Sequence, residues 1–202
     1  MNTEEFPTES YVREEFKLDL NRTRLFCVIV LFIAGVIFGL PFFLLWHENL
    51  KMHIINIEHE LLKRIINIVI FIIFVFAGFI IHELIHGFFA AIFNKNGFKS
   101  IRFGIMLSKG IAYCVNAEIL KTNKYIIGLL MPLIILGIIP SVLSIFTGYL
   151  YLFIFGLLFI IAASGDILLF LRIFKERYES WVEDKVSDNE VKIFIYRLEK
   201  AE

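Results

Sequence analysis

Residues 65–93 read IINIVIFIIFVFAGFIIHELIHGFFAAIF, and this stretch decides the fold. It is an apolar run long enough to cross a bilayer, for which about 20 residues of helix suffice. Near its end it is interrupted by His82, Glu83 and His86. Ionisable side chains near the bilayer centre cost about 2.5 kcal/mol or more each on insertion scales, so such a cluster requires compensation. The stretch therefore predicts a membrane-spanning helix that carries a polar site.

The whole chain has the composition of a membrane protein. Of its 202 residues, 58% are hydrophobic and 23 are Phe, and the mean hydropathy is +0.77. A soluble domain of this length could not hide several apolar runs that are each as long as a bilayer is thick. Lys plus Arg equals Asp plus Glu at 20 each, so no basic excess indicates a nucleic-acid partner. The predicted surroundings are the lipid bilayer.

Three further apolar runs complete a four-span arrangement. The spans are expected at about 25–45, 65–93, 126–147 and 149–171. The last two runs meet at Thr147-Gly148-Tyr149, which predicts a tight antiparallel helical hairpin. Pro132 and Pro140 are expected to kink the third span, as neighbouring helices in a membrane can tolerate.

The segment between spans two and three contains two short apolar or alternating stretches. They cover Phe98–Leu107 and Ile111–Ala117 and are joined by Ser108-Lys109-Gly110, which predicts a β-hairpin. The predicted fold is an all-α polytopic membrane protein with four transmembrane helices and a small cytoplasmic β-hairpin between spans two and three. The expected parts are a cytoplasmic N-terminal segment (1–24), a membrane domain (25–173) and a cytoplasmic C-terminal tail (174–202).

Basic residues indicate the orientation of the spans. They precede span one and crowd the segment between spans two and three: Lys17, Arg22, Arg24, Lys95, Lys99, Arg102, Lys109, Lys121 and Lys124. Because cytoplasmic flanks of membrane spans carry an excess of Lys and Arg, both segments are predicted to be cytoplasmic. The expected location is the cell membrane, multi-pass, with both termini in the cytoplasm.

The interruption in span two, His82-Glu83-Leu84-Ile85-His86, matches the HExxH signature of zinc metalloproteases. Residues four apart share one face of a helix, so the two imidazoles can meet at a single point, as tetrahedral Zn²⁺ requires. Glu83 lies beside them, where it can serve as the general base for a water molecule that the metal activates. The alternative is a pair of core histidines with Glu83 as their ion-pair partner, and the cost of ionisable groups in an apolar run disfavours it.

A catalytic zinc takes three protein ligands and leaves one position for water, so a third ligand is expected elsewhere. Asp166 is the best candidate, because it is the only acidic residue inside spans one, three and four. Its depth agrees, since Asp166 and His86 lie about 8 Å and about 10 Å of helix from the cytoplasmic ends of their spans. The alternative for Asp166 is a helix-end carboxylate that reaches toward water or pairs with Arg172. The rival ligands are Cys114, Glu118, His53 and His59.

With this motif in one span and Gly165-Asp166 in a later one, the sequence resembles the site-2 protease class of intramembrane zinc metalloproteases. It resembles more closely a small bacterial family described as putative zincin peptidases, through His-Glu-Leu-Ile-His-Gly and the pair Tyr113-Cys114. The likeness covers about residues 65–172. It implies that His82 and His86 bind zinc, that Glu83 is the general base and that Asp166 is the third ligand. Site-2 proteases also carry an Asn near the Asp, and Asn116 is the residue here that could replace it.

The predicted function is that of a membrane-embedded zinc metalloendopeptidase of the HExxH type. Its substrate would be a membrane protein or peptide, cleaved near the cytoplasmic face. The hairpin could hold an unwound substrate segment by strand addition, or it could be an ordinary surface hairpin. One alternative function is a non-catalytic membrane protein in which a structural metal ties spans two and four together. The other is a metal transporter. This alternative is weaker, because the sequence has only four predicted spans with one compact site and shows no inverted repeat.

Overall fold

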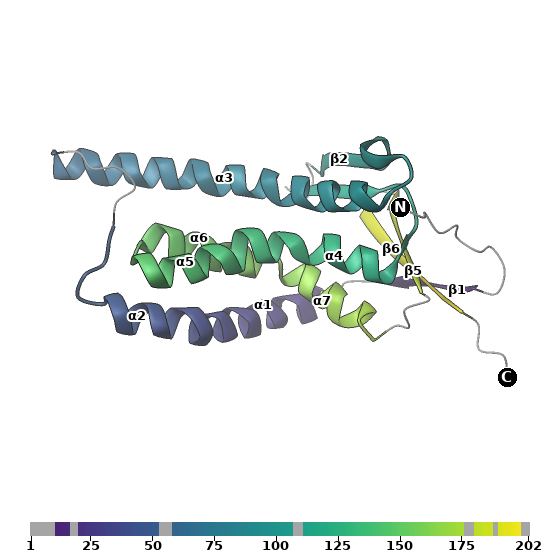
Figure 1. Cartoon of the computed structure of the whole chain (residues 1–202), viewed down its shortest axis with the longest axis horizontal. Coiled ribbons are helices and arrows are strands. Elements are labelled where there is room, and N and C mark those ends of the chain that lie inside the picture. The colour runs from purple at the N-terminus through teal and green to yellow at the C-terminus, as the bar shows by residue number, and fades with distance from the viewer. Residues whose placement is uncertain are drawn as a thin grey trace. The chain divides into compact units, whose positions relative to one another are not determined.

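The computed structural model describes residues 11–16, 20–52, 58–106, 111–175, 180–187 and 190–198, and most of these are helical (Figure 1). In chain order the elements are β1 (Tyr11–Phe16), α1 (Leu20–Ala34), η1 (Gly35–Gly39), α2 (Leu40–Trp46), α3 (Glu60–Phe93), η2 (Gly97–Ser100), β2 (Ile101–Met106), β3 (Ile111–Asn116), β4 (Leu120–Lys121), α4 (Thr122–Pro132), η3 (Leu133–Ile138), α5 (Ile139–Thr147), α6 (Leu150–Ala162), α7 (Ser164–Ile173), β5 (Trp181–Ser187) and β6 (Glu190–Leu198). The chain divides into two compact units. We call residues 21–82 and 132–164 the helix unit, and residues 1–20, 83–131 and 165–202 the sheet unit.

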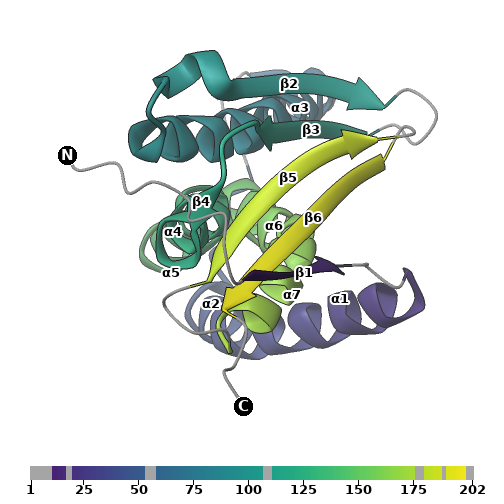
Figure 2. The ribbon, with the colours of Figure 1, turned by 90° about the vertical axis from the view of Figure 1, so that its right-hand side faces the viewer.

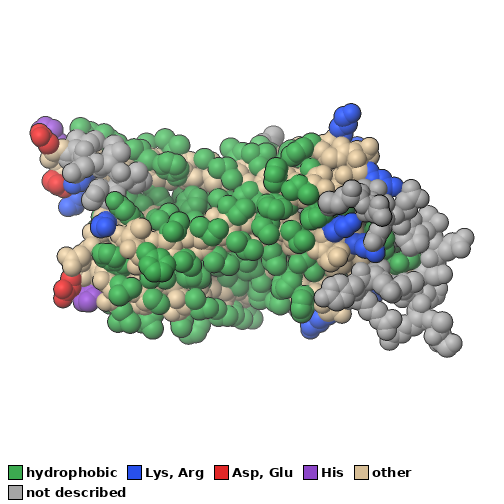
Figure 3. All heavy atoms as spheres, viewed as in Figure 1, with side chains coloured by type: hydrophobic (Ala, Val, Ile, Leu, Met, Phe, Trp, Pro, Cys, Tyr) green, Lys and Arg blue, Asp and Glu red, His purple; other side chains and the backbone are tan. Residues whose placement is uncertain are grey.

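Three helices in the described part of the chain are long and apolar enough to cross a membrane. They are Thr23–Trp46, Glu60–Phe93 and Thr122–Thr147. Their side chains suit a lipid environment, because large apolar residues such as Phe32 (71% exposed) and Phe76 (68% exposed) lie on the outside. Figure 3 shows hydrophobic side chains covering much of this helical surface. The chain therefore has three candidate spans, or four if α6 and α7 are counted together as one.

The sequence predicts one span over about 149–171, but in the structure this last apolar run is broken. It forms two helices, α6 and α7, that are bent by 45°. The break falls at Ala163, whose backbone has φ −75° and ψ 8° and so leaves the helical range. Next to it, the Ser164 hydroxyl donates a hydrogen bond of 2.6 Å to the carbonyl of Ile161, a local bond of the kind that competes with regular helix.

In the helix unit, the third and fourth runs meet through the tight turn that the sequence predicts. Gly148 adopts a left-handed conformation with φ +74°, which glycine tolerates best, and its N–H donates to the carbonyl of Ser144 at 2.8 Å. The helices then pack very closely, since a β carbon on Gly156 would lie 2.7 Å from the backbone nitrogen of Ser141. Small residues permit this approach of helices in membranes. Upstream, the helix is π-helical immediately after Pro132, which has no N–H for the regular ladder.

In the sheet unit, β2 and β3 pair antiparallel from Ile101↔Asn116 to Met106↔Ile111. This is the region where the sequence predicts a β-hairpin. The connection around Lys109 lies outside the described residues. The cytoplasmic placement of the hairpin stays a prediction.

A second sheet was not predicted, and the all-α description of the fold is corrected by it. Four strands pair in the order β1-β6-β5-β4. Figure 2 shows these strands toward the viewer. β1 comes from the N-terminal segment and β5 and β6 come from the predicted tail. Because β1 pairs with β6 across most of the chain, no local sequence pattern links the two strands.

The sheet packs on helices of its own unit and so positions α4 and α7. Leu129 of α4, Leu169 and Ile173 of α7, and Ile195 of β6 form a buried apolar cluster. Arg172 of α7 donates to the Glu14 carboxylate of β1 at 2.8 Å. The sheet therefore fixes the two helices that approach the HExxH motif.

Candidate metal centre

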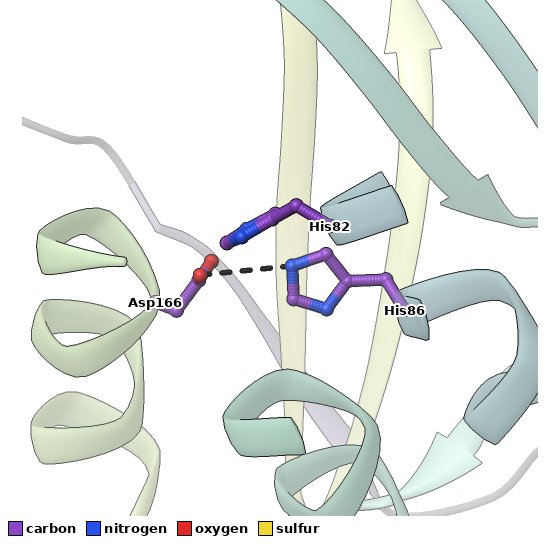
Figure 4. A group of neighbouring side chains, drawn as sticks. All are labelled: His82, His86 and Asp166. Atoms are coloured by element: carbon purple, nitrogen blue, oxygen red, sulfur yellow. Dashed lines mark ion pairs between the residues drawn. The ribbon is translucent and has the colours of Figure 1, made fainter. Parts of the chain in front are cut away.

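The three predicted ligands lie together in the structure. Figure 4 shows the rings of His82 and His86 and the carboxylate of Asp166 directed toward one another. One ligand atom from each lies within 4.8 Å of the others, and His86 Nε2 is 3.6 Å from Asp166 Oδ2. The boundary between the two units falls between His82 and Glu83, but α3 continues through it without a break. The helix itself therefore places His82 one turn before His86.

This donor set fits zinc. Two imidazole nitrogens and one carboxylate oxygen are a ligand combination typical of catalytic zinc, with a fourth position left for water. Two ligands at about 2.0–2.1 Å from a tetrahedral metal lie about 3.3 Å apart by geometry. The 3.6 Å separation between His86 and Asp166 needs only a small adjustment to reach that value.

His86 is oriented by a backbone carbonyl. Its Nδ1 lies 3.0 Å from the carbonyl oxygen of Gly128, one of the residues of α4. When Nδ1 carries the proton and donates it to this carbonyl, Nε2 keeps its lone pair on the side of Asp166. Metal-binding histidines usually have such a partner on the second nitrogen, because it fixes the tautomer and the ring. Gly128 is therefore part of the support of the site.

The rival ligands do not belong to this group in the described part of the chain. Glu118 accepts hydrogen bonds from the backbone N–H groups of Lys95 at 2.7 Å and Asn96 at 3.0 Å. Burial raises the pKa of Glu118, but these donors outweigh it and bring the pKa below its usual value. His59 precedes α3, about 35 Å of helix before His82. His53 lies outside the described residues.

Cys114 lies on β3 near two carboxylates and is not a member of the group. Burial raises the pKa of its thiol to about 12, and the negative charges of Glu83 and Asp184 add to the effect. A thiol in this state is a weak metal ligand, because zinc binds the thiolate. Cys114 pairs with Phe103, whose ring lies against Gly87, so the hairpin comes near the motif.

Asn116, the residue that could replace the Asn of site-2 proteases as an oxyanion stabiliser, has its side-chain amide bonded to another residue. Its side-chain amide exchanges hydrogen bonds of 2.8 and 3.1 Å with that of Asn94, just beyond the end of α3. Both residues are buried. The pair ties β3 to α3, which makes Asn116 a structural anchor of the hairpin.

Two residues beside the site carry no signal in the sequence. Asp184 of β5 accepts a hydrogen bond of 2.9 Å from the Tyr125 hydroxyl of α4. Burial raises the pKa of Asp184 to about 6, while the bonds from Tyr125 and Asn116 and the charge of a protonated His86 act in the opposite direction. The bond from Tyr125 places this carboxylate against α4, the helix whose Gly128 carbonyl contacts His86. Sequence reasoning missed it because β5 was assigned to a tail without a motif.

Together these features define a helical protein with several candidate spans and a possible His-His-Asp metal centre beside a glutamate. A profile of the family described as "Putative zincin peptidase" matches residues 75–181, just over half of the chain. The chain belongs to this family, which implies zinc and a metallopeptidase. Comparisons with curated proteins and with solved structures gave no match. The matched range includes the motif and Asp166 and ends three residues before Asp184.

Proposed function

We propose that the protein is a membrane-embedded zinc metalloendopeptidase that cleaves membrane or membrane-associated proteins near the cytoplasmic face. The observation that carries this proposal is the convergence of His82, His86 and Asp166 within 4.8 Å, with Glu83 next to His82 in α3. Membership of the zincin family supports the same chemistry. The apolar helices support a membrane setting.

In this proposal each residue of the site has one task. His82, His86 and Asp166 hold the metal, and the carbonyl of Gly128 keeps the His86 ring in place. Bound zinc supplies Lewis-acid chemistry, which lowers the pKa of water and polarises a carbonyl. Glu83 accepts the proton of the attacking water and returns a proton to the amine that leaves.

The length of α3 supports cleavage near one membrane face. Its 34 residues extend about 51 Å, whereas the hydrocarbon core is about 30 Å thick. If Lys63 and Arg64 mark one boundary, the core ends about 20 residues later, close to His86. A peptide bond presented there can meet water. A helical substrate must unwind first, because its backbone groups are bonded within the helix.

The β2–β3 hairpin is suited to hold such an unwound segment. It packs directly on α3 beside the motif, since a β carbon on Gly87 would lie 2.9 Å from the Phe103 ring. An extended substrate could add to this small sheet as a further strand, which would use its freed backbone groups. We propose that the hairpin binds the substrate in this way.

Removal of the metal tests the proposed reaction. We expect that the purified protein in vesicles cleaves single-span membrane substrates, that a zinc chelator stops cleavage, and that added Zn²⁺ restores it. The measurement is the appearance of the shorter fragment on a gel, and added Mg²⁺ is the control because it prefers oxygen ligands. Full cleavage by protein shown to contain no zinc would contradict the proposal.

The proposed topology places both termini and the region of Lys109 in the cytoplasm. The test uses single cysteines introduced in a Cys27→Ser, Cys114→Ser background and an impermeant thiol reagent applied to intact cells. A cysteine at Lys109 is expected to react only after the cells are opened, because basic segments stay on the cytoplasmic side. A cysteine at Glu48, between spans one and two, is the control and should react in intact cells. Labelling of position 109 from outside would overturn this topology.

A further inference from the structure

We propose that Asp184 of β5 is a positioning residue of the metal centre and acts on His86 through Tyr125 and α4. The inference rests on the proposed function of that site. It makes the C-terminal strands a part of the site, although the sequence set them apart as a tail.

The first line of evidence is a chain of contacts within the sheet unit. Asp184 Oδ1 accepts a hydrogen bond of 2.9 Å from the hydroxyl of Tyr125. Three residues later, about one turn of α4, the carbonyl of Gly128 lies 3.0 Å from His86 Nδ1. The turn of helix that Asp184 holds is therefore the turn that orients the His86 ring.

A second contact fixes the same carboxylate from the other side. Asp184 Oδ2 lies 3.4 Å from the backbone nitrogen of Asn116, whose N–H points to it. The Asn116 side chain is in turn bonded to Asn94, just beyond the end of α3. Asp184 is thus connected to α4, whose Gly128 carbonyl contacts His86, and to the end of α3, the helix that carries His86.

The strand that carries Asp184 is itself firmly held against the start of α4. Thr122 Oγ1 donates to the Ser180 carbonyl at 2.9 Å, and β4, which runs directly into α4, pairs with β5. Val182 is only 1% exposed. The hydrogen bond from Tyr125 therefore ends on a strand that is itself held to the start of α4.

The chemistry of Asp184 suits a role at a metal centre better than a purely structural one. Asp184 is half-buried and pairs with Ile193 in the sheet, so removing part of its charge from water costs free energy. An apolar residue at this position would stabilise the sheet without this cost. A negative charge near His86 makes its imidazole a better ligand for a cation. Outer partners of metal-binding histidines typically change metal affinity about 10–100-fold when they are removed.

The test compares Asp184→Asn and Tyr125→Phe with the matched control Tyr196→Phe. Tyr196 donates a 2.6 Å hydrogen bond to Glu183 in the same sheet. It follows Ile195, which packs with Leu129 of α4, so its side chain lies on the opposite face of the sheet and its loss reports a structural effect on the sheet. Zinc affinity is measured by competition with a chromophoric chelator. The visible spectrum of the Co²⁺-loaded protein reports the ligand geometry, and thermal unfolding of the metal-free protein in detergent reports stability.

We expect Asp184→Asn and Tyr125→Phe to weaken zinc binding by about tenfold and to shift the Co²⁺ bands. Tyr196→Phe should leave the zinc affinity and the Co²⁺ bands unchanged. Wild-type affinity and an unchanged Co²⁺ spectrum in Tyr125→Phe would overturn the inference, even if Asp184→Asn failed to fold. In that case the wild-type protein still binds zinc, so the proposed function stands. A wild-type protein that binds no metal would overturn both.

Discussion

Replacement of Glu83 by glutamine is expected to reduce peptide cleavage by about 10²–10⁴-fold, because the amide cannot accept the proton that the carboxylate accepts. The side chain keeps its size and shape, so the packing of α3 should not change. Zinc content should also remain near the wild-type value, since Glu83 is not a member of the ligand group. The measurement pairs the yield of cleaved fragment from a co-expressed single-span substrate with metal analysis of the purified variant.

Glu118→Gln is the matched control for this substitution. Glu118 is also a glutamate of the sheet unit, but its carboxylate caps the N–H groups of Lys95 and Asn96 and does not join the ligand group. The Glu118→Gln variant should cleave the substrate at close to the wild-type rate. Its free energy of unfolding should fall by about 1–2 kcal/mol, because the hydrogen bonds to Lys95 and Asn96 are weakened. If the metal were only structural, Glu83→Gln would be as silent as Glu118→Gln. Cleavage by Glu83→Gln at the wild-type rate would therefore exclude the proposed mechanism.

The apolar helices could be predicted from the sequence because their signal is local and strong. A run of apolar residues as long as the bilayer is thick is rare in soluble domains, and the three long candidate spans coincide with three of the predicted runs. The turn at Gly148 has a local signal as well. The break at Ala163 has a weaker one, because small residues permit a bend but do not require it.

The four-stranded sheet could not be predicted in the same way. Only β5 and β6 are neighbours in the sequence; β1 comes from the N-terminal segment and β4 from the segment before α4. The pairings of β1 with β6 and of β4 with β5 depend on the folded arrangement of the chain. An alternating pattern in Glu190–Leu198 is visible, but strand preference depends strongly on the packing that surrounds a segment. β6 pairs locally with β5, but its pairing with β1 joins residues from opposite ends of the chain and has no local signal.

The candidate site shows the same division between local and long-range information. The helical period alone puts His82 and His86 on one face of the helix. Asp166 could be predicted as the third ligand because its depth in its apolar run agrees with that of His86. The structure places its carboxylate beside His86. Tyr125 and Asp184 are 59 residues apart and their contact depends on the packing of a strand on a helix, so no spacing rule could reveal it.

Loss of both histidines should have the largest effect on the metal. The wild-type protein purified in detergent is expected to contain roughly one zinc per chain, because two imidazoles and a carboxylate suit this ion. The double variant His82→Ala, His86→Ala should contain almost none, since a single carboxylate holds zinc poorly. Asp166→Ala should weaken binding less completely, because the two imidazoles can retain zinc while water fills the vacant position.

His59→Ala is the matched control, because His59 is an exposed histidine just before α3 and is far from the ligand group. It should retain the zinc content of the wild-type protein, and circular dichroism should show the same helix content in all variants. The order of zinc content should then be His59→Ala equal to wild type, Asp166→Ala lower, and the double histidine variant lowest. That order separates a centre built on His82, His86 and Asp166 from nonspecific binding to surface histidines, which would respond equally to any of the substitutions. A folded double variant with the full zinc content would show that the metal is held elsewhere and would remove the basis of the proposed peptidase.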